Sequence, residues 1–135
     1  MFLLHYLYLA DYSMHNILIV EDEFIIAMLI EKQVRKLGYM VVGKVANGEG
    51  AIQRVKDGGV DLVLMDIKIN GDLDGIQTMH EIQRFSTVPV IYITGNSDPA
   101  TRERAMATNP SGYIIKPIET EALRVEIEAA LGTST

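Results

Sequence analysis

Short apolar runs alternate with helix-like segments five times between Asn16 and Leu131. The runs are rich in Val, Ile and Leu and show little polar alternation, which is typical of strands buried on both faces of a parallel sheet. The segments between them carry apolar residues every three or four positions, as amphipathic helices do. This alternation predicts an α/β chain in which each strand is followed by a helix.

The predicted strands and helices form five consecutive pairs. The strands cover Ile17–Val20, Met40–Val45, Leu62–Met65, Val88–Thr94 and Gly112–Ile115. The helices cover Glu23–Leu37, Gly48–Lys56, Gly75–Arg84, Pro99–Ala107 and Glu119–Leu131. Fold preference then favours a flavodoxin-like (βα)5 fold, a doubly wound parallel sheet with strand order 2-1-3-4-5. In this order strands 1, 3 and 4 converge at the switch point of the sheet, where ligands bind.

Composition limits the classes of function. A chain of 135 residues with 48% hydrophobic residues fits one domain with one core. Its net charge of −6, without a basic run, argues against binding to nucleic acid. The absence of cysteine excludes disulfides and thiolate metal sites and agrees with a cytoplasmic location. The three histidines, His5, His15 and His80, do not have the spacing of metal ligands.

Residues 1–14 are predicted to be an N-terminal extension ahead of a domain that covers residues 15–132. Met1–Ala10 is apolar, but it is too short to span a membrane and lacks the basic flank and cleavage site of a signal peptide. One interpretation is an upstream segment before a natural start at Met14. The other is a strip that docks on another chain, because an apolar patch is rarely left in water.

Polar side chains stand where the predicted strands end. Glu21 and Asp22 follow strand 1, Asp66 follows strand 3, Thr94 ends strand 4, and Lys116 follows strand 5. Because carboxyl ends of parallel strands share one edge, we expect these groups to converge.

Crowded carboxylates attract a hard divalent cation, and Mg²⁺ prefers one or two carboxylates together with phosphate oxygens. Asp66 is then a nucleophile toward phosphorus. Lys116 is expected to pair with Asp66 at rest and with a phosphoryl oxygen afterwards, and Thr94 to donate a hydrogen bond to another phosphoryl oxygen. Each residue taken alone also has an ordinary structural interpretation, such as a helix-capping acid or a solvated lysine.

The arrangement resembles the response regulator receiver domains (CheY-like) of two-component signal transduction. The resemblance covers roughly residues 15–131 and rests on ILIVEDE, LVLMDIKINGDLDGI, VPVIYITG and GYIIKP, each at the end of the right strand. It implies that Asp66 accepts phosphate from a sensor histidine kinase or phosphotransfer protein. It implies Mg²⁺ held by Glu21, Asp22, Asp66 and the backbone carbonyl of Lys68. It also implies switch residues Thr94 and Tyr113, a phosphate-contacting Lys116, and a cis peptide before Pro117.

Three positions depart from the family's pattern. Glu21 stands where the family more often has Asp, so its contact with the metal is expected to run through water. Gly95 stands where Ala is commoner and leaves the phosphoryl pocket more open. In the loop after Asp66, Asn70 replaces a proline, and Asp74-Gly75 falls one residue later than usual.

Two other functions fit these residues less well. An aspartyl phosphotransferase of the haloacid dehalogenase type needs a second Asp two residues after the nucleophile, where this chain has Lys68. A phosphorylation-independent interaction module on the same scaffold would not need the acid, Thr and Lys set. We therefore expect a signalling domain, not an enzyme. It would act on an unknown protein target or its own output domain, with the face formed by residues 98–131 contacting a partner or a second copy in a homodimer.

Overall fold

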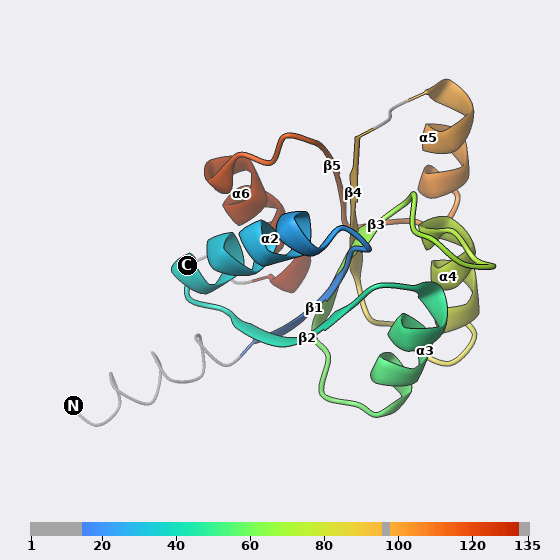
Figure 1. Cartoon of the computed structure of the whole chain (residues 1–135), viewed down its shortest axis with the longest axis horizontal. Helices are drawn as coiled ribbons and strands as arrows, with labels where there is room; N and C mark the ends of the chain where they lie inside the picture. The colour runs from blue at the N-terminus through green and yellow to red at the C-terminus, as the bar shows by residue number, and fades with distance from the viewer. Residues whose placement is uncertain (1–14, 96–97, 133–135) are drawn as a thin grey trace.

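The computed structural model describes residues 15–95 and 98–132. It contains a five-stranded parallel sheet in the order β2-β1-β3-β4-β5, as predicted. The strands are β1 (Asn16–Val20), β2 (Met40–Val45), β3 (Leu62–Asp66), β4 (Val90–Thr94) and β5 (Gly112–Ile115). The helices are α2 (Phe24–Lys36), α3 (Gly48–Lys56), α4 (Gly75–Ile82), α5 (Pro99–Met106) and α6 (Thr120–Leu131). Helices cover both faces of the sheet (Figure 1).

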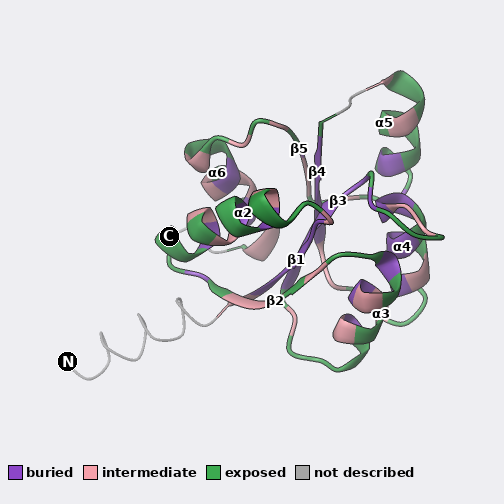
Figure 2. Cartoon of the chain, in the orientation of Figure 1, coloured by how far each residue is buried: buried purple, intermediate pink, exposed green. Residues whose placement is uncertain are grey.

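Two apolar clusters lie on opposite faces of the sheet. Alternate residues of β1 show this division, since Ile17 and Ile19 pack toward α2 and α6, whereas Leu18 and Val20 pack with the cluster under α3, α4 and α5. Strands β3 and β4 are buried at every residue (Figure 2). Burial on both faces explains why these strands read as continuous apolar runs instead of alternating ones.

The predicted elements all exist, and their ends differ by a few residues. Strand β3 includes Asp66, so this carboxylate lies inside the sheet ladder and not just beyond it. Strand β4 begins at Val90, later than predicted, because Pro89 has no N–H to donate and contributes only its carbonyl to Val63. Helix α4 ends at Ile82, two residues before the predicted Arg84.

Three helix ends follow local sequence signals. Gly38, which follows α2, has a φ of +95°, a conformation that glycine adopts at little cost. Asp98 caps α5 by accepting from the Thr101 N–H, and Pro99 occupies the first turn, both as predicted. Asp74 caps α4 in a capping box with Gln77. Within the part of the chain that the structure describes, none of the helices is long and apolar enough to cross a membrane. The predicted N-terminal extension lies outside the described residues.

Candidate functional site

The candidate site lies at the carboxyl edge of the central strands. Glu21 follows β1, Asp66 is the last residue of β3, Thr94 is the last residue of β4, and Lys116 follows β5. The order of the strands places β3 between β1 and β4, so Asp66 is in the middle of this edge. The convergence predicted from the sequence is therefore found for Glu21, Asp66 and Lys116, whose side chains are in direct contact.

Lys116 bridges two buried carboxylates. Its Nζ donates to Glu21 Oε1 at 2.8 Å and to Asp66 Oδ2 at 3.2 Å. Glu21 and Asp66 are only 4% and 5% exposed, so few water molecules can share their charge. The sequence predicted the Lys116 contact with Asp66 but not the shorter one with Glu21. The signal was present, because Glu21 directly follows the buried strand next to β3.

Burial and mutual contacts shift the pKa values of Asp66, Glu21 and Lys116 in different ways. Burial and the nearby charge of Glu21 raise the pKa of Asp66 to about 6, although Lys116 opposes the rise. Burial also acts against ionisation of Glu21, but the hydrogen bonds from Lys116 and from the Glu23 N–H hold its pKa below the usual value. For Lys116, burial disfavours the charge, yet its two carboxylate partners raise its pKa. Lys116 is thus a fixed cation beside Asp66.

Glu21, Asp22 and Asp66 form an acidic group suited to a hard cation. Each has a carboxylate oxygen within 4.8 Å of the others. Each also binds one backbone N–H: Glu23 N donates to Glu21, Lys68 N to Asp66, and Asn70 N to Asp22. A carboxylate has about four acceptor positions, so oxygen ligands remain available on all three. Mg²⁺ takes hard oxygen ligands and is usually held by one or two carboxylates, which this acidic group can supply, so the residues present fit that ion.

Thr94 and Tyr113 lie on one face of the sheet. Tyr113 pairs with Tyr92 in the register of β4 and β5, and Thr94 is two residues beyond Tyr92, so all three point toward the side that α5 covers. The rings of Tyr92 and Tyr113 meet edge to face with centroids 6.5 Å apart. The guanidinium of Arg102, on α5, lies 4.8 Å from the centroid of Tyr113. Arg102 is a contact of the predicted switch aromatic that sequence reasoning missed.

The Tyr113 hydroxyl is buried and has no hydrogen-bond partner among the described residues. A buried hydroxyl without a partner is energetically unfavourable in place. Burial is also the main reason why the pKa of Tyr113 is raised. The ring is therefore held by its packing contacts and not by its hydroxyl.

The loop between β3 and α4 packs closely against the backbone of Asp66. Gly75 N donates to Ile67 O at 2.7 Å, and a Cβ at Gly75 would lie 2.2 Å from Asp66 O. Gly71 in this loop has a φ of +112°, whereas Asn70 does not adopt a positive φ. The glycine at position 75 is required by the close approach of α4 to the backbone of Asp66. The Lys116–Pro117 peptide, on the opposite side of the site, is cis.

Comparison with known proteins decides the family. The family model for the response regulator receiver domain matches residues 17–128. The chain belongs to the response regulator receiver domain family. As a receiver domain it is a signalling module of two-component systems, with the CheY-like fold described above.

Two solved receiver domains have closely similar folds. One is the signal receiver domain of a modulated diguanylate cyclase from Desulfovibrio desulfuricans, with 37% identity, a TM-score of 0.82, and coverage of 87% of this chain and 94% of that chain. The other is the receiver domain of a sensor histidine kinase from Pseudomonas aeruginosa, with 30% identity, a TM-score of 0.79, and coverage of 87% and 98%. That receiver domain has a magnesium ion coordinated in its active site cleft.

Curated relatives of the receiver domain are longer proteins. A transcriptional regulatory protein of Bacillus subtilis is 32% identical over 117 residues, which are 87% of this chain and 49% of the relative. A transcriptional regulatory protein of Klebsiella oxytoca is 32% identical over 117 residues, which are 86% of this chain and 26% of the relative. The chain thus spans about half or less of the length of these relatives.

Proposed function

We propose that Asp66 is the phosphoryl acceptor of this receiver domain. The contact that carries the proposal is the bridge from Lys116 to Asp66, which is one of three carboxylates that together fit Mg²⁺. An oxygen of Asp66 attacks the phosphorus of a phosphohistidine on a sensor kinase or phosphotransfer protein. The phosphorus–nitrogen bond breaks, its electron pair stays on the imidazole, and an acyl phosphate forms on Asp66.

The remaining site residues have distinct proposed roles. Glu21, Asp22, Asp66 and the backbone carbonyl of Lys68 would hold Mg²⁺, which neutralises charge on the transferring phosphoryl group when bound. Lys116 would exchange its contact with Asp66 for one with a phosphoryl oxygen. The close contact of Lys116 with Glu21 supports a direct metal role for Asp22 and a water-mediated one for Glu21.

Thr94 and Tyr113 would convert phosphorylation into a change at the surface. A Thr94 hydroxyl drawn toward the phosphoryl group would vacate space on the face that it shares with Tyr113. The hydroxyl of Tyr113 favours movement of the ring, because its resting position gives that hydroxyl no hydrogen bond to any described residue. Phosphorylation would then shift the population between two positions of the ring and of α5.

An apolar groove beside the site suits the protein that donates the phosphoryl group. The groove has a volume of about 660 Å³ and lies between α2 and the segment from Lys116 to Thr120. Phe24, Ile25 and Leu29 of α2 are 75%, 65% and 53% exposed, an unusual grouping of large apolar side chains. Because Lys116 lines the groove and also contacts Asp66, a protein seated there can present its phosphohistidine to Asp66.

The surface formed by α5, β5 and α6, on the opposite side of the site, suits binding of a downstream protein. Met106, Ile115 and Val125 are exposed apolar residues of α5, β5 and α6. Helix α5 carries Arg102 and Arg104, whereas α6 and the residue before it carry acidic residues such as Glu119 and Glu121. A second copy of this chain could set the basic helix of one protomer against the acidic helix of the other, so we propose a phosphorylation-dependent homodimer through residues 98–131.

We further propose that residues 15–132 form the functional domain, that it works in the cytoplasm, and that its output passes through protein contacts and not through nucleic acid. The relatives that are transcriptional regulatory proteins suggest an output domain as one such contact. Phosphorylation-independent binding is the competing function. No contact in the site favours phosphorylation-independent binding, because such binding gives the Lys116 bridge no role.

The deciding experiment is labelling with acetyl phosphate and Mg²⁺. The intact chain should gain one phosphoryl group at Asp66, detected by mass spectrometry after borohydride trapping. Asp66→Asn should not be labelled, and EDTA should prevent labelling of the unsubstituted protein. Labelling of Asp66→Asn at the unsubstituted level, or labelling that survives EDTA, would contradict the proposal.

A further inference from the structure

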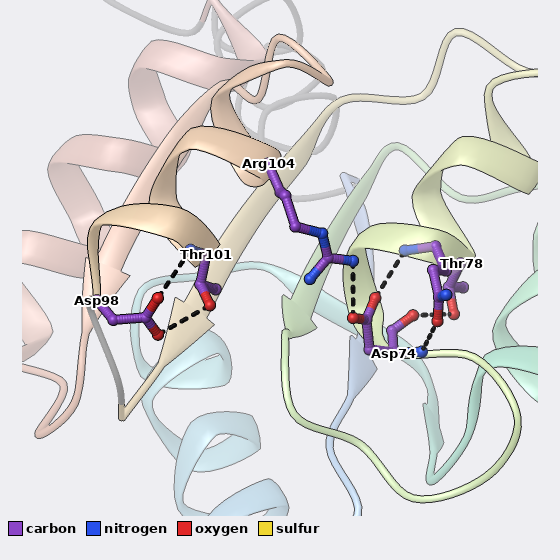
Figure 3. Close-up of polar contacts among 6 residues, drawn as sticks. Asp74, Thr78, Asp98, Thr101 and Arg104 are labelled. Carbon is purple, nitrogen blue, oxygen red and sulfur yellow. Dashed lines mark hydrogen bonds and ion pairs between the residues drawn. The ribbon is translucent and has the colours of Figure 1, made fainter.

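The carboxylate of Asp74 serves two helices at once. Its Oδ1 accepts from Gln77 N at 2.8 Å, and the Gln77 side chain accepts from Asp74 N at 2.8 Å, which closes the capping box of α4. Its Oδ2 accepts from Arg104 Nη2 of α5 at 2.9 Å (Figure 3). A capping box needs only the first pair of bonds. The bond to Arg104 is therefore an additional tie between α4 and α5.

Asp74 is in a fixed position relative to the acceptor. The next residue, Gly75, is bonded through its N–H to Ile67 O at 2.7 Å and leaves no room for a Cβ beside Asp66 O. The backbone of Asp66 thus abuts the first turn of α4. We therefore expect a displacement of Ile67 to reach Asp74 through the Gly75–Ile67 hydrogen bond, without passing along the whole loop.

The middle of this loop is attached to the acidic group. Asn70 N donates to Asp22 Oδ2 at 3.1 Å, so the loop from Ile67 to Asp74 contacts the site near its middle as well as at its start. A change in what Asp22 binds alters the acceptor available to Asn70. The loop therefore has contacts that respond to the state of the site and one contact, at Asp74, that reaches α5.

Helix α5 is anchored firmly at its carboxyl end. Thr108, just after the helix, is buried and shares a hydrogen bond of 2.8 Å with the Tyr92 hydroxyl. Thr108 Oγ1 is also bonded to Ala105 O, and Gln83 Nε2 donates to Thr108 O at 2.8 Å. Ala105 is the single buried residue of α5. The rest of the helix has little apolar contact to resist a change in its tilt.

We propose that the Asp74–Arg104 ion pair is a latch that couples the loop after Asp66 to the tilt of α5, with Thr108 as the pivot. The latch rests on the proposed function, because it gives the phosphorylated loop a route to α5. This route is separate from the Thr94–Tyr113 pair, which reaches α5 through strands β4 and β5 and the Arg102 contact. Closed, the latch holds α5 against α4; when the loop moves, Asp74 moves with it and α5 is released.

The exposure of the ion pair suits a latch. The side chains of Arg104 and Asp74 are 48% and 30% exposed. Exposed pairs contribute little, so breaking this one should raise the opening of α5 by about two- to fivefold, enough to bias an equilibrium without unfolding the domain. Because such pairs are screened by salt, the bias should fall as ionic strength rises.

The test is amide hydrogen exchange of the unphosphorylated intact chain, followed residue by residue by NMR. Arg104→Gln should speed exchange in α5 by about two- to fivefold at low salt, while the amides that follow Met106 should be unchanged because Thr108 remains bonded. Arg84→Gln is the matched control, since it removes the same charge from an exposed ion pair that Arg84, just after α4, forms locally with Glu81 of α4. Raising the salt to 0.5 M should bring Arg104→Gln and the unsubstituted protein together.

Asp74→Asn makes the test specific. Asn caps helices as well as Asp does, so this variant keeps α4 but weakens the pair with Arg104. In a double-mutant cycle, Asp74→Asn with Arg104→Gln should speed exchange in α5 no more than either substitution alone. Additive effects, or exchange in Arg104→Gln equal to that of Arg84→Gln, would overturn the latch.

A second arm separates failure of the latch from failure of the proposed function. Beryllofluoride with Mg²⁺ should speed exchange in α5 of the unsubstituted protein and should change it less in Arg104→Gln, where the latch is already open. If beryllofluoride acts equally on both proteins, the latch is wrong and the proposed function stands. If it leaves α5 unchanged in the unsubstituted protein, the latch and the proposed switching of this surface are both wrong, whereas phosphoryl acceptance by Asp66 is tested separately by the labelling experiment.

Discussion

Lys116 donates its shorter hydrogen bond to Glu21, at 2.8 Å, and not to the proposed acceptor. Glu21 is the residue that replaces the family's more frequent Asp, and its longer side chain brings its carboxylate to the lysine. Glu21 is therefore neutralised within the protein, whereas Asp22 is only partly buried and bonded to a backbone N–H. The two neighbouring acids have different environments.

This difference predicts unequal contributions to metal affinity. Asp22→Asn should weaken Mg²⁺ binding by at least about tenfold, because a direct charged ligand is lost. Glu21→Gln should weaken it less, because the charge of Glu21 is already engaged by Lys116. Mg²⁺ titrations followed by NMR or calorimetry would check the order. The reverse order would show that Glu21 is the direct ligand.

The groove on α2 predicts a substitution that separates two phosphodonors. One donor is a phosphorylated histidine phosphotransfer protein that labels the unsubstituted chain. Leu29→Glu should slow phosphotransfer from this donor by about tenfold, since a buried charge disfavours the docked complex. Labelling by acetyl phosphate should not change, because Leu29 is 53% exposed and does not contact Asp66. Met106→Glu, on α5, is the matched control and should leave both rates unchanged. Equal loss with the two donors would remove the groove as a docking surface.

The close approach at Gly75 predicts a large loss of stability on adding one methyl group. Gly75→Ala should lower the free energy of unfolding by about 3 kcal/mol or more, because its Cβ would lie 2.2 Å from a backbone carbonyl and 2.9 Å from Ile67 Cα. Gly95→Ala should change it by less than about 0.5 kcal/mol, since the nearest atom is the Lys116 Cδ at 4.0 Å. Urea unfolding of both variants would measure this. Similar midpoints would show that α4 can withdraw from Asp66.

Tyr92 predicts how stability depends on alkaline pH. Burial is the main cause that raises the pKa of Tyr92 to about 12, so the folded state holds this proton more tightly than the unfolded state, in which the pKa is about 10. The bound proton of Tyr92 therefore contributes about 2 to 3 kcal/mol to the free energy of unfolding. This contribution is complete below pH 10 and is lost as the pH rises from 10 to 12.

Tyr92→Phe should be less stable than the unsubstituted protein by about 1 kcal/mol at pH 8, where it lacks the bond to Thr108. Its stability should fall less steeply above pH 10, so the difference between the two proteins should shrink or reverse. Urea unfolding at pH 8, 10 and 11.5 would follow this. Parallel pH profiles would show that Tyr92 ionises equally in both states.

The sequence predicted the features that depend on local pattern. Buried strands read as apolar runs, and the carboxyl ends of strands 1, 3, 4 and 5 carry polar residues, so the convergence on Asp66 followed from the topology. The cap at Asp98 and the first-turn Pro99 were also readable, because both act within one turn of helix. The predicted end of α4 at Arg84 was wrong, since the apolar period does not mark where a helix stops.

Contacts between elements could not be predicted in this way. The pairing of Glu21 with Lys116 depends on side-chain length and on the angle at which two strands end. The Asp74–Arg104 pair joins residues 30 positions apart whose helices approach each other only in the packed domain. The hydrogen bond between Tyr92 and Thr108 likewise depends on how far the Tyr92 side chain reaches beneath α5, and the hydrophobic period of the sequence does not predict this.

The division of the interior by the sheet has a consequence for how such a domain can be altered. The apolar cluster under α2 and α6 and the cluster under α3, α4 and α5 have no buried residue in common. The proposed donor surface is supported by the first cluster, and α5 is supported by the second. The changes in the free energy of unfolding caused by repacking the two clusters should therefore be additive. An engineer could repack the interior under α5 without altering the α2 surface, whereas α6 shares its cluster with α2 and would respond to changes made for a new kinase.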